Sequence, residues 1–383
     1  MEQQEYAVGL DIGTTKIVAM IGRKNEYGKL EILGVGRSKS LGVHRGVVNN
    51  ITQTINSIQQ AVSQAEAVSG IKIKDVTVGI AGQHIRSLQH SDYITRADSE
   101  VVIDQDDIAN LCNQVFKLVM LPGEEIIHVV VGQVASIRNI YRCVKSADLE
   151  LKRITLEPLA SADAVLSQEE KEAGVALIDI GGGTTDLAIF KDGIIRHTAV
   201  IPQGGNIITQ DIKEGCSIIE KQAELLKTKF GSAWPGENKE NEIVSIPGLR
   251  GREPKEITLK NLSKIIHARV IEILETVFVE IKNYGHDEPK KQLIAGVVLT
   301  GGDSDTESTS PLFATAVGLV MKGLEGQFEE DEEEAVEEET VLEQSTEEGE
   351  ETDEESSTIS DEVKKKGIFD AWATRFKDFL DKA

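Results

Sequence analysis

The sequence is poor in cysteine, and its three cysteines, Cys112, Cys143 and Cys216, lie far apart. No Cys-x-x-Cys pair occurs, so neither a zinc site nor a disulfide framework is indicated. The seven histidines contain no pair four residues apart, and we interpret each as an ordinary core or surface residue. This use of cysteine fits the reducing cytoplasm.

Long apolar runs are also missing. No stretch of 18 or more apolar residues occurs, so we expect no membrane-spanning helix. A strand-like segment begins by Tyr6, which leaves no room for a signal peptide. We therefore expect any membrane contact to be peripheral.

Basic residues are absent from one long segment. Residues 325–362 contain 20 Asp and Glu and no Lys or Arg, whereas the whole chain of 383 residues has a net charge of −24. The remaining residues are therefore close to neutral, and the acidity says little about what the folded part binds. High charge and low hydrophobicity predict that this segment is disordered, next to a part long enough for two or more domains.

Two similar segments stand out among the residues that are present. They are Asp11-Ile-Gly-Thr-Thr-Lys16 and Asp179-Ile-Gly-Gly-Gly-Thr-Thr-Asp186, and each follows a short apolar run. Glycine lets backbone N–H groups approach a phosphate closely, and an aspartate beside such a turn can hold Mg²⁺ through water. Two such loops predict paired domains that clamp one nucleotide. The alternative is two unrelated turns after strands.

This pattern resembles the actin-like ATPase superfamily, whose members share two phosphate loops, two connecting helices and an adenosine loop. The connecting helices resemble Glu157–Leu166 and Pro311–Leu319, and the adenosine loop resembles Val297–Gly302. Within the superfamily the sequence is most similar to the FtsA family of bacterial cell-division proteins. The segments that carry this similarity are Gly42-Val43, Gly46–Val48, Gly79–His84, Gly204–Asp211, Ile246–Arg252 and Ile265–Glu272.

The resemblance implies an α/β, actin-like fold with two duplicated mixed-sheet domains around a nucleotide cleft. It divides the chain into subdomain 1A (5–82), a shortened 1C-like insertion (83–145), a return to 1A (146–173), subdomain 2A (174–230), subdomain 2B (231–284), the rest of 2A with a return to 1A (285–324), an acidic linker (325–363) and a terminal helix (364–383). The sequence is shorter than the family pattern at two places, before Val129 and after Gly302. We favour missing segments as the explanation at both.

Local patterns predict individual elements. Strands are expected at Tyr6–Asp11, Ile17–Gly22, Leu30–Gly36, Val76–Ile80 and Ile126–Val134. Helices are expected from Asn50 to Gly70, where apolar residues recur at helical spacing, from Asp104, and over Thr258–Tyr284.

The resemblance also implies a site for ATP and Mg²⁺. Asp11 and Asp179 would hold Mg²⁺ through water. Phosphates would contact Gly13, Thr14 and Thr15 from one side and Gly181, Gly182, Gly183 and Thr184 from the other. Lys16 either neutralises a phosphate or faces solvent. The adenosine would lie near Gly205, Glu224, Lys227, Gly301 and Gly302. No residue stands out as a general base, and the family implies weak ATPase activity at most.

The implied partners are the C-terminal peptide of the tubulin-like protein FtsZ, other copies of the chain, further division proteins and anionic inner-membrane lipids, with no role for nucleic acid. Arg250, Arg252, Lys255 and Arg269 of subdomain 2B are candidate contacts for an acidic peptide. The alternative is that these cations pair locally with Glu253, Glu256 and Glu272.

The last 20 residues predict an amphipathic helix with a net charge of +3. Its apolar stripe consists of Ile368, Phe369, Trp372, Phe376, Phe379 and Leu380. An aromatic face with basic flanks is typical of a helix that lies in an anionic membrane surface. The alternatives are docking onto its own domain, against which the long solvated linker argues, and docking into a groove of a partner protein.

The predicted function is therefore an actin-like, ATP-binding division protein that polymerises and tethers FtsZ filaments to the cytoplasmic face of the inner membrane at the septum. Rival functions are a small-molecule kinase of the same fold and a filament protein of the MreB type. A kinase would have no use for a tethered amphipathic helix. A chaperone of the DnaK type would need a substrate domain for which the chain has no room.

Overall fold

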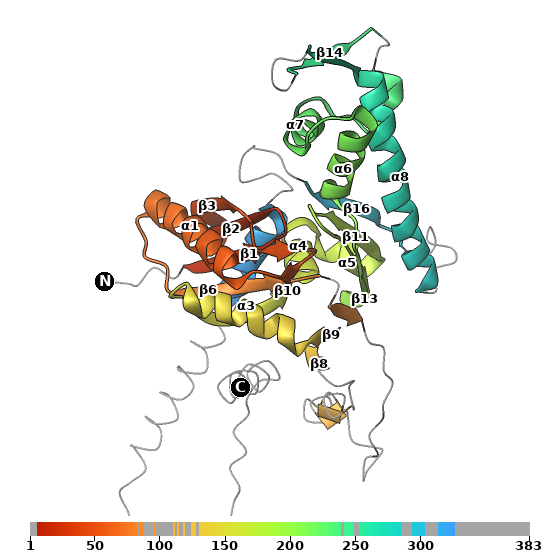
Figure 1. Cartoon of the computed structure of the whole chain (residues 1–383). Helices are drawn as coiled ribbons and strands as arrows, with labels where there is room; N and C mark the ends of the chain where they lie inside the picture. Colours follow the sequence, from red (N-terminus) through yellow and green to blue (C-terminus); the bar gives the residue numbers. More distant parts are fainter. Residues whose placement is uncertain are drawn as a thin grey trace, which may run out of the picture. The chain divides into compact units, whose positions relative to one another are not determined.

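A computed structural model gives the fold. It describes residues 6–82, 84–87, 93, 95, 110–111, 113–114, 118, 124–127, 130–238, 241–248, 253–284, 293–302 and 313–325. The elements discussed below belong to these residues and are labelled in Figure 1 where there is room.

The first sheet has five strands in the order β10-β6-β1-β2-β3. Its strands are β1 (Ala7–Ile12), β2 (Lys16–Lys24), β3 (Leu30–Lys39), β6 (Asp75–Ile80) and β10 (Glu150–Leu156). The first three form antiparallel hairpins, whereas β6 runs parallel to β1 and β10 runs parallel to β6. All six residues of β1 are buried, because this strand lies in the middle of the sheet.

Helix α1 (Ile51–Ser69) packs against β2 and β3, as Figure 1 shows. The Asn50 side chain caps its first turn by accepting from the Gln53 amide, and Gly70 ends it in a left-handed conformation. Gly36 of β3 lets the helix approach, because a Cβ there would lie 1.8 Å from the Ala61 carbonyl oxygen. The predicted bounds of this helix are confirmed.

The second sheet repeats the hairpins of the first, in the order β13-β12-β11-β16. Its strands are β11 (Val175–Ile180), β12 (Thr185–Lys191), β13 (Ile194–Ile201) and β16 (Gly296–Gly301). The first three are antiparallel and β16 runs parallel to β11. Short helices α4 (Glu157–Val165) and α5 (Gln168–Ala173) lead from β10 into this sheet. The duplicated mixed sheets that the sequence predicted are therefore present.

Three α-helices, a 3-10 turn and a small hairpin lie between β13 and β16 in the chain. They are α6 (Gly205–Cys216), α7 (Glu220–Phe230), the 3-10 turn η1 (Pro235–Glu237), β14 (Ile243–Ile246), β15 (Lys255–Thr258) and α8 (Leu259–Asn283). Apolar side chains of α6, α7, α8 and the β14–β15 hairpin share one core. The long helix predicted over Thr258–Tyr284 is confirmed as α8, with Thr258 as its cap.

A third small sheet corrects one prediction. The apolar run Ile126–Val134, expected as a single strand, is split into β8 (Glu124–Ile127) and β9 (Val130–Gln133), which pair antiparallel, and Val134 begins helix α3 (Val134–Ser146). Strand β7 (Ile85–Ser87) pairs with the other edge of β9. The two residues between the strands, His128 and Val129, are not typical turn residues, so the sequence could not show this division.

Helix α3 packs against α1 and against β10 of the first sheet. The predicted extent of the insertion, residues 83–145, stays a prediction. The start of the helix predicted from Asp104 lies outside the described residues, whereas residues 110–111 and 113–114 are described and are helical.

Strand β16 has apolar residues at the surface. It is the last strand of its sheet, and its residues Val297 and Leu299 are 53% and 56% exposed. The shortening predicted after Gly302 falls on residues outside the described ones and stays a prediction.

A helix near the end of the described chain crosses α4 closely. Gly318 lies in this helix (residues 314–325), and a Cβ at Gly318 would lie 1.8 Å from the Ala160 carbonyl oxygen.

We expect Gly318→Ala to lower the free energy of unfolding by about 1–3 kcal/mol, because the backbone must shift. Gly215→Ala in α6 is the matched control. Its methyl group meets only the tip of Ile265, and alanine favours a helix by about 1 kcal/mol. Urea unfolding of both variants measures the difference, and equal stabilities would contradict the close crossing.

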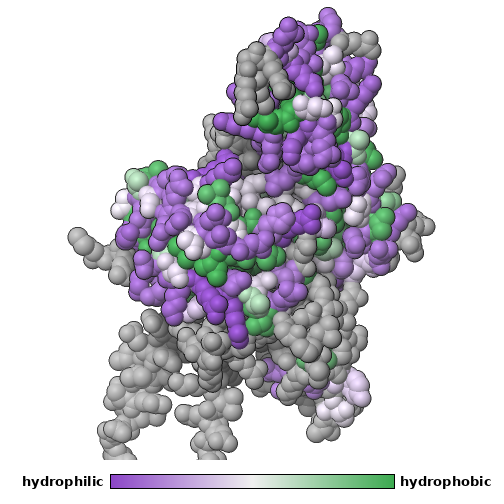
Figure 2. Space-filling view, viewed as in Figure 1, coloured by the Kyte–Doolittle hydropathy of each residue, from purple (hydrophilic) through white to green (hydrophobic). Residues whose placement is uncertain are grey.

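No helix among the described residues is long and apolar enough to cross a membrane. On the face shown in Figure 2, the described surface is mainly hydrophilic, with apolar side chains in small separate patches.

Candidate nucleotide site

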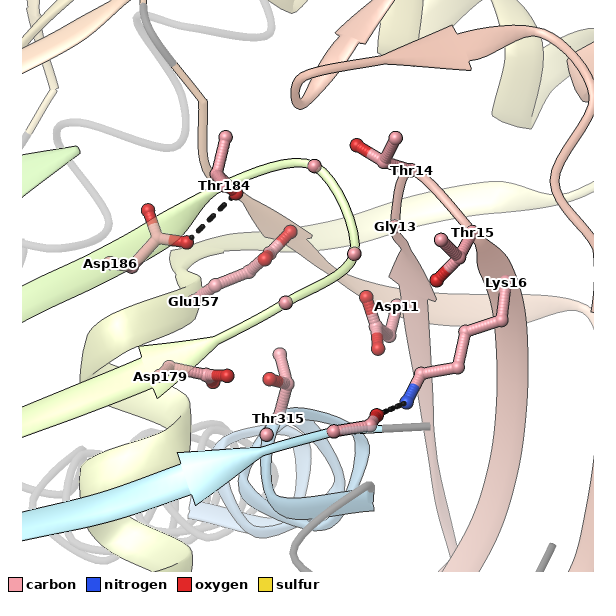
Figure 3. Close-up of a pocket in the computed structure, with 15 residues that line it drawn as sticks. Asp11, Gly13, Thr14, Thr15, Lys16, Glu157, Asp179, Thr184, Asp186 and Thr315 are labelled. Atoms are coloured by element: carbon pink, nitrogen blue, oxygen red, sulfur yellow. Dashed lines mark hydrogen bonds between the residues drawn. The ribbon is translucent and has the colours of Figure 1, made fainter. Parts of the chain in front are cut away.

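Two hairpin turns, one from each sheet, line a single hollow. Residues 13–15 connect β1 to β2, and residues 181–184 connect β11 to β12. We call these turns loop 1 and loop 2. The residues that line the hollow are Asp11, Gly13, Thr14, Thr15, Lys16, Glu157, Asp179, Gly181, Gly182, Gly183, Thr184, Asp186, Gly301, Gly302 and Thr315 (Figure 3).

The two hairpins are equivalent in register. Asp11 lies opposite Val18 on the paired strand, and Asp179 lies opposite Asp186. Each hairpin therefore points an aspartate from the end of its first strand into the hollow. Figure 3 shows both carboxylates directed toward the space between the loops.

Glycine in loop 2 allows the loops to touch. A Cβ at Gly182 would lie 2.1 Å from Thr15 Cγ2, and a Cβ at Gly183 would lie 2.7 Å from Thr14 Cγ2. Loop 2 is held from behind by α6, because the Gly181 carbonyl accepts from the Gly205 amide at 2.9 Å. Side chains at positions 182 and 183 would therefore push the two loops apart.

Asp179 is held by hydroxyl groups. Ser161 of α4 donates to Asp179 Oδ2 at 3.0 Å, and the Ser161 and Thr315 hydroxyls lie 2.9 Å apart. Gly301 at the end of β16 covers the same carboxylate, since a Cβ there would lie 2.6 Å from Asp179 Oδ1. Its φ of +97° also favours glycine.

Burial raises the pKa of every carboxyl group in the hollow. It raises the pKa of Asp11 to about 6, with Lys16 opposing and Asp179 adding to the shift. It raises the pKa of Asp186 to about 7 with a contribution from Asp179, and it raises the pKa values of Asp179 and Glu157 as well. Four acidic groups thus share a buried space in which Lys16 is the one lysine among the described lining residues.

Lys16 lies beside the hollow rather than in open solvent. Its Nζ donates to the Gly302 carbonyl at 3.5 Å (Figure 3). It also lies 5.9 Å from the centre of the Phe313 ring. Of the two alternatives for Lys16, this position suits the neutralisation of an anion.

The residues present fit a hydrated divalent cation. Among the described residues, no group of three acidic, histidine or cysteine side chains is arranged to hold a metal ion. Asp186 Oδ1 is buried without a hydrogen-bond partner, while its Oδ2 accepts from Thr184 at 3.2 Å. Such an oxygen is stabilised when a cation or ordered water reaches it.

The sequence alone did not single out Glu157, Asp186 and Thr315 as site residues. Asp186 closes the second glycine segment, and its place opposite Asp179 could have been found from hairpin pairing. Glu157 begins α4 and Thr315 lies in the last described helix. Only the fold brings these two residues to the loops.

The raised pKa values predict that the nucleotide-free protein is less stable at higher pH. A carboxyl group whose pKa is higher in the folded state than its ordinary 3.8 stabilises the fold when protonated, and this contribution is lost as the pH rises through 6 and 7. We therefore expect the melting temperature to fall between pH 5.5 and pH 8. Asp186→Asn should flatten this fall, whereas Asp75→Asn, at an exposed position, should not. Thermal melts of the three proteins across this range measure the slopes, and equal slopes would contradict the electrostatic account.

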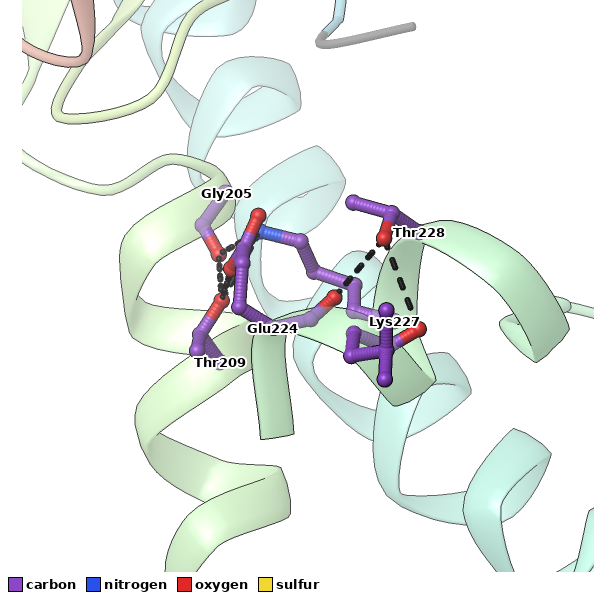
Figure 4. A network of polar contacts seen from close by, with 6 residues as sticks. Gly205, Thr209, Glu224, Lys227 and Thr228 are labelled. Carbon is purple, nitrogen blue, oxygen red and sulfur yellow. Dashed lines mark hydrogen bonds and ion pairs between the residues drawn. The ribbon is translucent and has the colours of Figure 1, made fainter. Parts of the chain in front are cut away.

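Three of the predicted adenosine residues form a second cluster. Lys227 Nζ donates to the Gly205 carbonyl at 3.1 Å and to Thr209 Oγ1 at 2.8 Å, and pairs with Glu224 Oε2 at 2.8 Å (Figure 4). The Thr209 hydroxyl also donates to Glu224. These residues do not line the hollow, but Gly205 joins it through its bond to loop 2.

Two of the four predicted partner-binding cations have partners within the chain. Arg269 binds both oxygens of Asp211, at 2.6 and 3.0 Å, and Glu272 at 2.7 Å. Lys255 Nζ donates to the Cys216 carbonyl. Arg250 and Arg252 lie outside the described residues, as do the predicted membrane residues Ile368, Phe369, Trp372, Phe376, Phe379 and Leu380.

Solved structures define the class of protein. The chain is similar to a chain of the PilM–PilN type IV pilus biogenesis complex, with a TM-score of 0.58 and 13% identity over 84% of this chain and 99% of that one. It is also similar to MreB5 of Spiroplasma citri bound to ADP, with a TM-score of 0.52 and 18% identity over 86% and 98% of the two chains. The chain therefore has the actin-like ATPase fold.

Sequence relatives define the family. The family model for Cell division protein FtsA matches residues 176–364. Cell division protein FtsA of Neisseria meningitidis serogroup B is 37% identical over 333 residues, covering 79% of this chain and 80% of that one. The protein of the same description from Pseudomonas aeruginosa is 35% identical over 383 residues, covering 85% and 91%. This chain belongs to the FtsA family and is a cell-division protein.

Proposed function

We propose that the chain binds Mg²⁺-ATP between loop 1 and loop 2 and uses the nucleotide to control its assembly and its contacts with other division proteins. The observation that carries this proposal is the single hollow lined by both loops and by both aspartates, Asp11 and Asp179. The similarity to a protein with ADP bound supports a nucleotide as the ligand.

Each part of the hollow suits one part of the ligand. Backbone amides of loops 1 and 2 and the Lys16 ammonium would bind the phosphates. Asp11, Asp179 and Asp186 would hold Mg²⁺ through water, and the cation would offset the repulsion among the buried carboxylates. Gly301 and Gly302, with the cluster around Lys227, would contact the adenosine.

Hydrolysis, where it occurs, needs a group that orients water. The carboxyl group of Asp186, whose pKa is raised to about 7, suits proton transfer near neutral pH, and Glu157, whose pKa is also raised, lines the same hollow. We propose weak ATPase activity at most, because a clamp between two domains can use the phosphate contacts alone to favour a closed state.

The partners and the location complete the proposal. The protein polymerises, binds the C-terminal peptide of FtsZ through subdomain 2B, and attaches to anionic lipid through residues 364–383. These activities tether FtsZ filaments to the cytoplasmic face of the inner membrane at the division site. Because Arg269 pairs with Asp211, we assign peptide binding to the four basic residues together rather than to Arg269 alone. These residues are Arg250, Arg252, Lys255 and Arg269.

Assembly on a lipid monolayer tests the whole proposal. The full chain should form filaments on an anionic monolayer in the presence of Mg²⁺ and ATP, visible by negative-stain electron microscopy, and fewer on a neutral monolayer. Filaments that form equally well without nucleotide would contradict the role of the hollow. Equal numbers of filaments on anionic and neutral monolayers would contradict the role of residues 364–383 in lipid binding.

A further inference from the structure

Loop 1 is bound to a second turn in the first half of the chain. The Gly46 amide donates to Thr14 Oγ1 at 3.0 Å. Gly46 and Arg45 form the turn between the short strands β4 (Val43–His44) and β5 (Val47–Val48). Both residues have positive φ, 73° and 49°, which is the geometry of a tight two-residue hairpin turn. The direction of the Gly46 amide is therefore fixed by the hairpin.

The same turn touches the start of the inserted segment. A Cβ at Gly46 would lie 2.6 Å from Gly82 Cα, and a Cβ at Gly82 would lie 3.0 Å from the Gly46 carbonyl carbon and oxygen. The two glycine backbones thus lie directly against each other. No flexible side chain lies between them to absorb a movement, so a shift of the turn displaces Gly82.

Gly82 leads into the small third sheet. The Ile85 amide donates to the Gly82 carbonyl at 3.0 Å, and β7, which Ile85 begins, pairs with β9. The Gln133 amide at the end of β9 donates to the His84 carbonyl at 3.3 Å. Strand β7 also lies beside β13, the end strand of the second sheet. Direct contacts therefore lead from Thr14 to the third sheet and on to the second half of the fold.

Thr14, where this series of contacts begins, can bind a phosphate and the Gly46 turn at the same time. Its methyl group lies against Gly183 of loop 2, and its hydroxyl oxygen accepts from Gly46. A hydroxyl has one donor hydrogen and two acceptor lone pairs, so it can donate to a phosphate oxygen while it accepts from Gly46. A phosphate bound at loop 1 would polarise the hydroxyl and strengthen its bond to the turn.

We propose that Thr14 is a positioning residue that transmits phosphate binding through Gly46 and Gly82 to the sheet β7-β9-β8. The inference rests on the proposed nucleotide site and adds a route by which that site stabilises this sheet. The sheet would then be more ordered with nucleotide than without it, and partners that recognise the sheet would bind the nucleotide-bound protein more tightly.

Amide hydrogen exchange of the full chain, measured by mass spectrometry, tests this coupling. Peptides that cover residues 124–133 should exchange more slowly in saturating Mg²⁺-ATP than without nucleotide. A hydrogen bond of ordinary net strength corresponds to about 2- to 12-fold in protection. Thr14→Val removes the hydroxyl and should abolish this difference at full occupancy, while Thr14→Ser keeps the hydroxyl and should restore it.

Controls separate this inference from the nucleotide site itself. Fluorescent ATP titrations first set the concentration that saturates each variant. Thr15→Val changes the neighbouring residue of loop 1 but leaves the Thr14–Gly46 bond, so its exchange difference should persist at saturation. Gly46→Ala should reduce it by separating the turn from Gly82. Failure of the unmodified chain to bind ATP would overturn the proposed site. ATP binding with no exchange difference at residues 124–133, or an equal difference in Thr14→Val, would overturn the coupling alone.

Discussion

Asp179→Asn is expected to weaken the binding of Mg²⁺-ATP about 10- to 100-fold, the usual effect of losing a group that holds a metal through its outer ligands. The side chain keeps its size, and its carbonyl oxygen can still accept from Ser161 as the carboxylate does at 3.0 Å. What is lost is the negative charge beside Asp11 and Asp186. The variant therefore isolates the electrostatic role of Asp179 from its packing.

The same substitution should stabilise the protein when no nucleotide is present. Burial raises the pKa of Asp179, and its charge raises the pKa values of Asp11, Glu157 and Asp186, so the folded state disfavours the charged form. Removing one charge relieves this repulsion. A gain of about 1 kcal/mol would raise the melting temperature by about 2–4 °C in a domain of 150–250 residues.

Calorimetric titration with ATP and Mg²⁺, together with thermal melts without nucleotide, measures both effects. Asp75→Asn at the exposed start of β6 is the control and should change neither quantity. If Asp179→Asn binds Mg²⁺-ATP as tightly as the unmodified chain, Asp179 is not part of the site. A variant that binds weakly and also melts lower would indicate general damage rather than lost charge.

Removal of residues 364–383 should abolish binding to anionic vesicles. The last 20 residues have a net charge of +3 and an apolar stripe of six residues, and each basic residue near an anionic surface contributes about 1 kcal/mol. We expect the fraction that sediments with vesicles to fall at least tenfold. The acidic segment 325–362 should not bind such a surface, because like charges repel.

Three chains separate the contributions. The full chain, a chain that ends at Val363 and a chain that ends at Leu324 are sedimented with anionic and with neutral vesicles. The two shortened chains should both remain in solution. Equal sedimentation of all three would place lipid binding in the body of the protein, and high salt should weaken binding of the full chain by screening its charges.

Much of the fold could be predicted because its signals are local. Asn50 and Gly70 mark the ends of α1, and each glycine loop follows an apolar strand whose next-to-last residue is aspartate. The division of Ile126–Val134 into two strands could not be predicted, because an apolar run does not show where a hairpin turns. The site residues Glu157 and Thr315 belong to helices outside the two loops. In the same way, Asp211 lies far in sequence from Arg269, with which it pairs. Only tertiary packing brings such residues together.

The Mg²⁺ dependence of ATP binding tests the central claim most directly. ATP is titrated into the full chain by calorimetry, once with Mg²⁺ and once with EDTA. If both loops hold one metal-chelated triphosphate, one ATP binds per chain and its affinity falls at least tenfold without the metal, because the buried carboxylates then repel the phosphates. Equal affinity in the two titrations, or no binding in either, would contradict it.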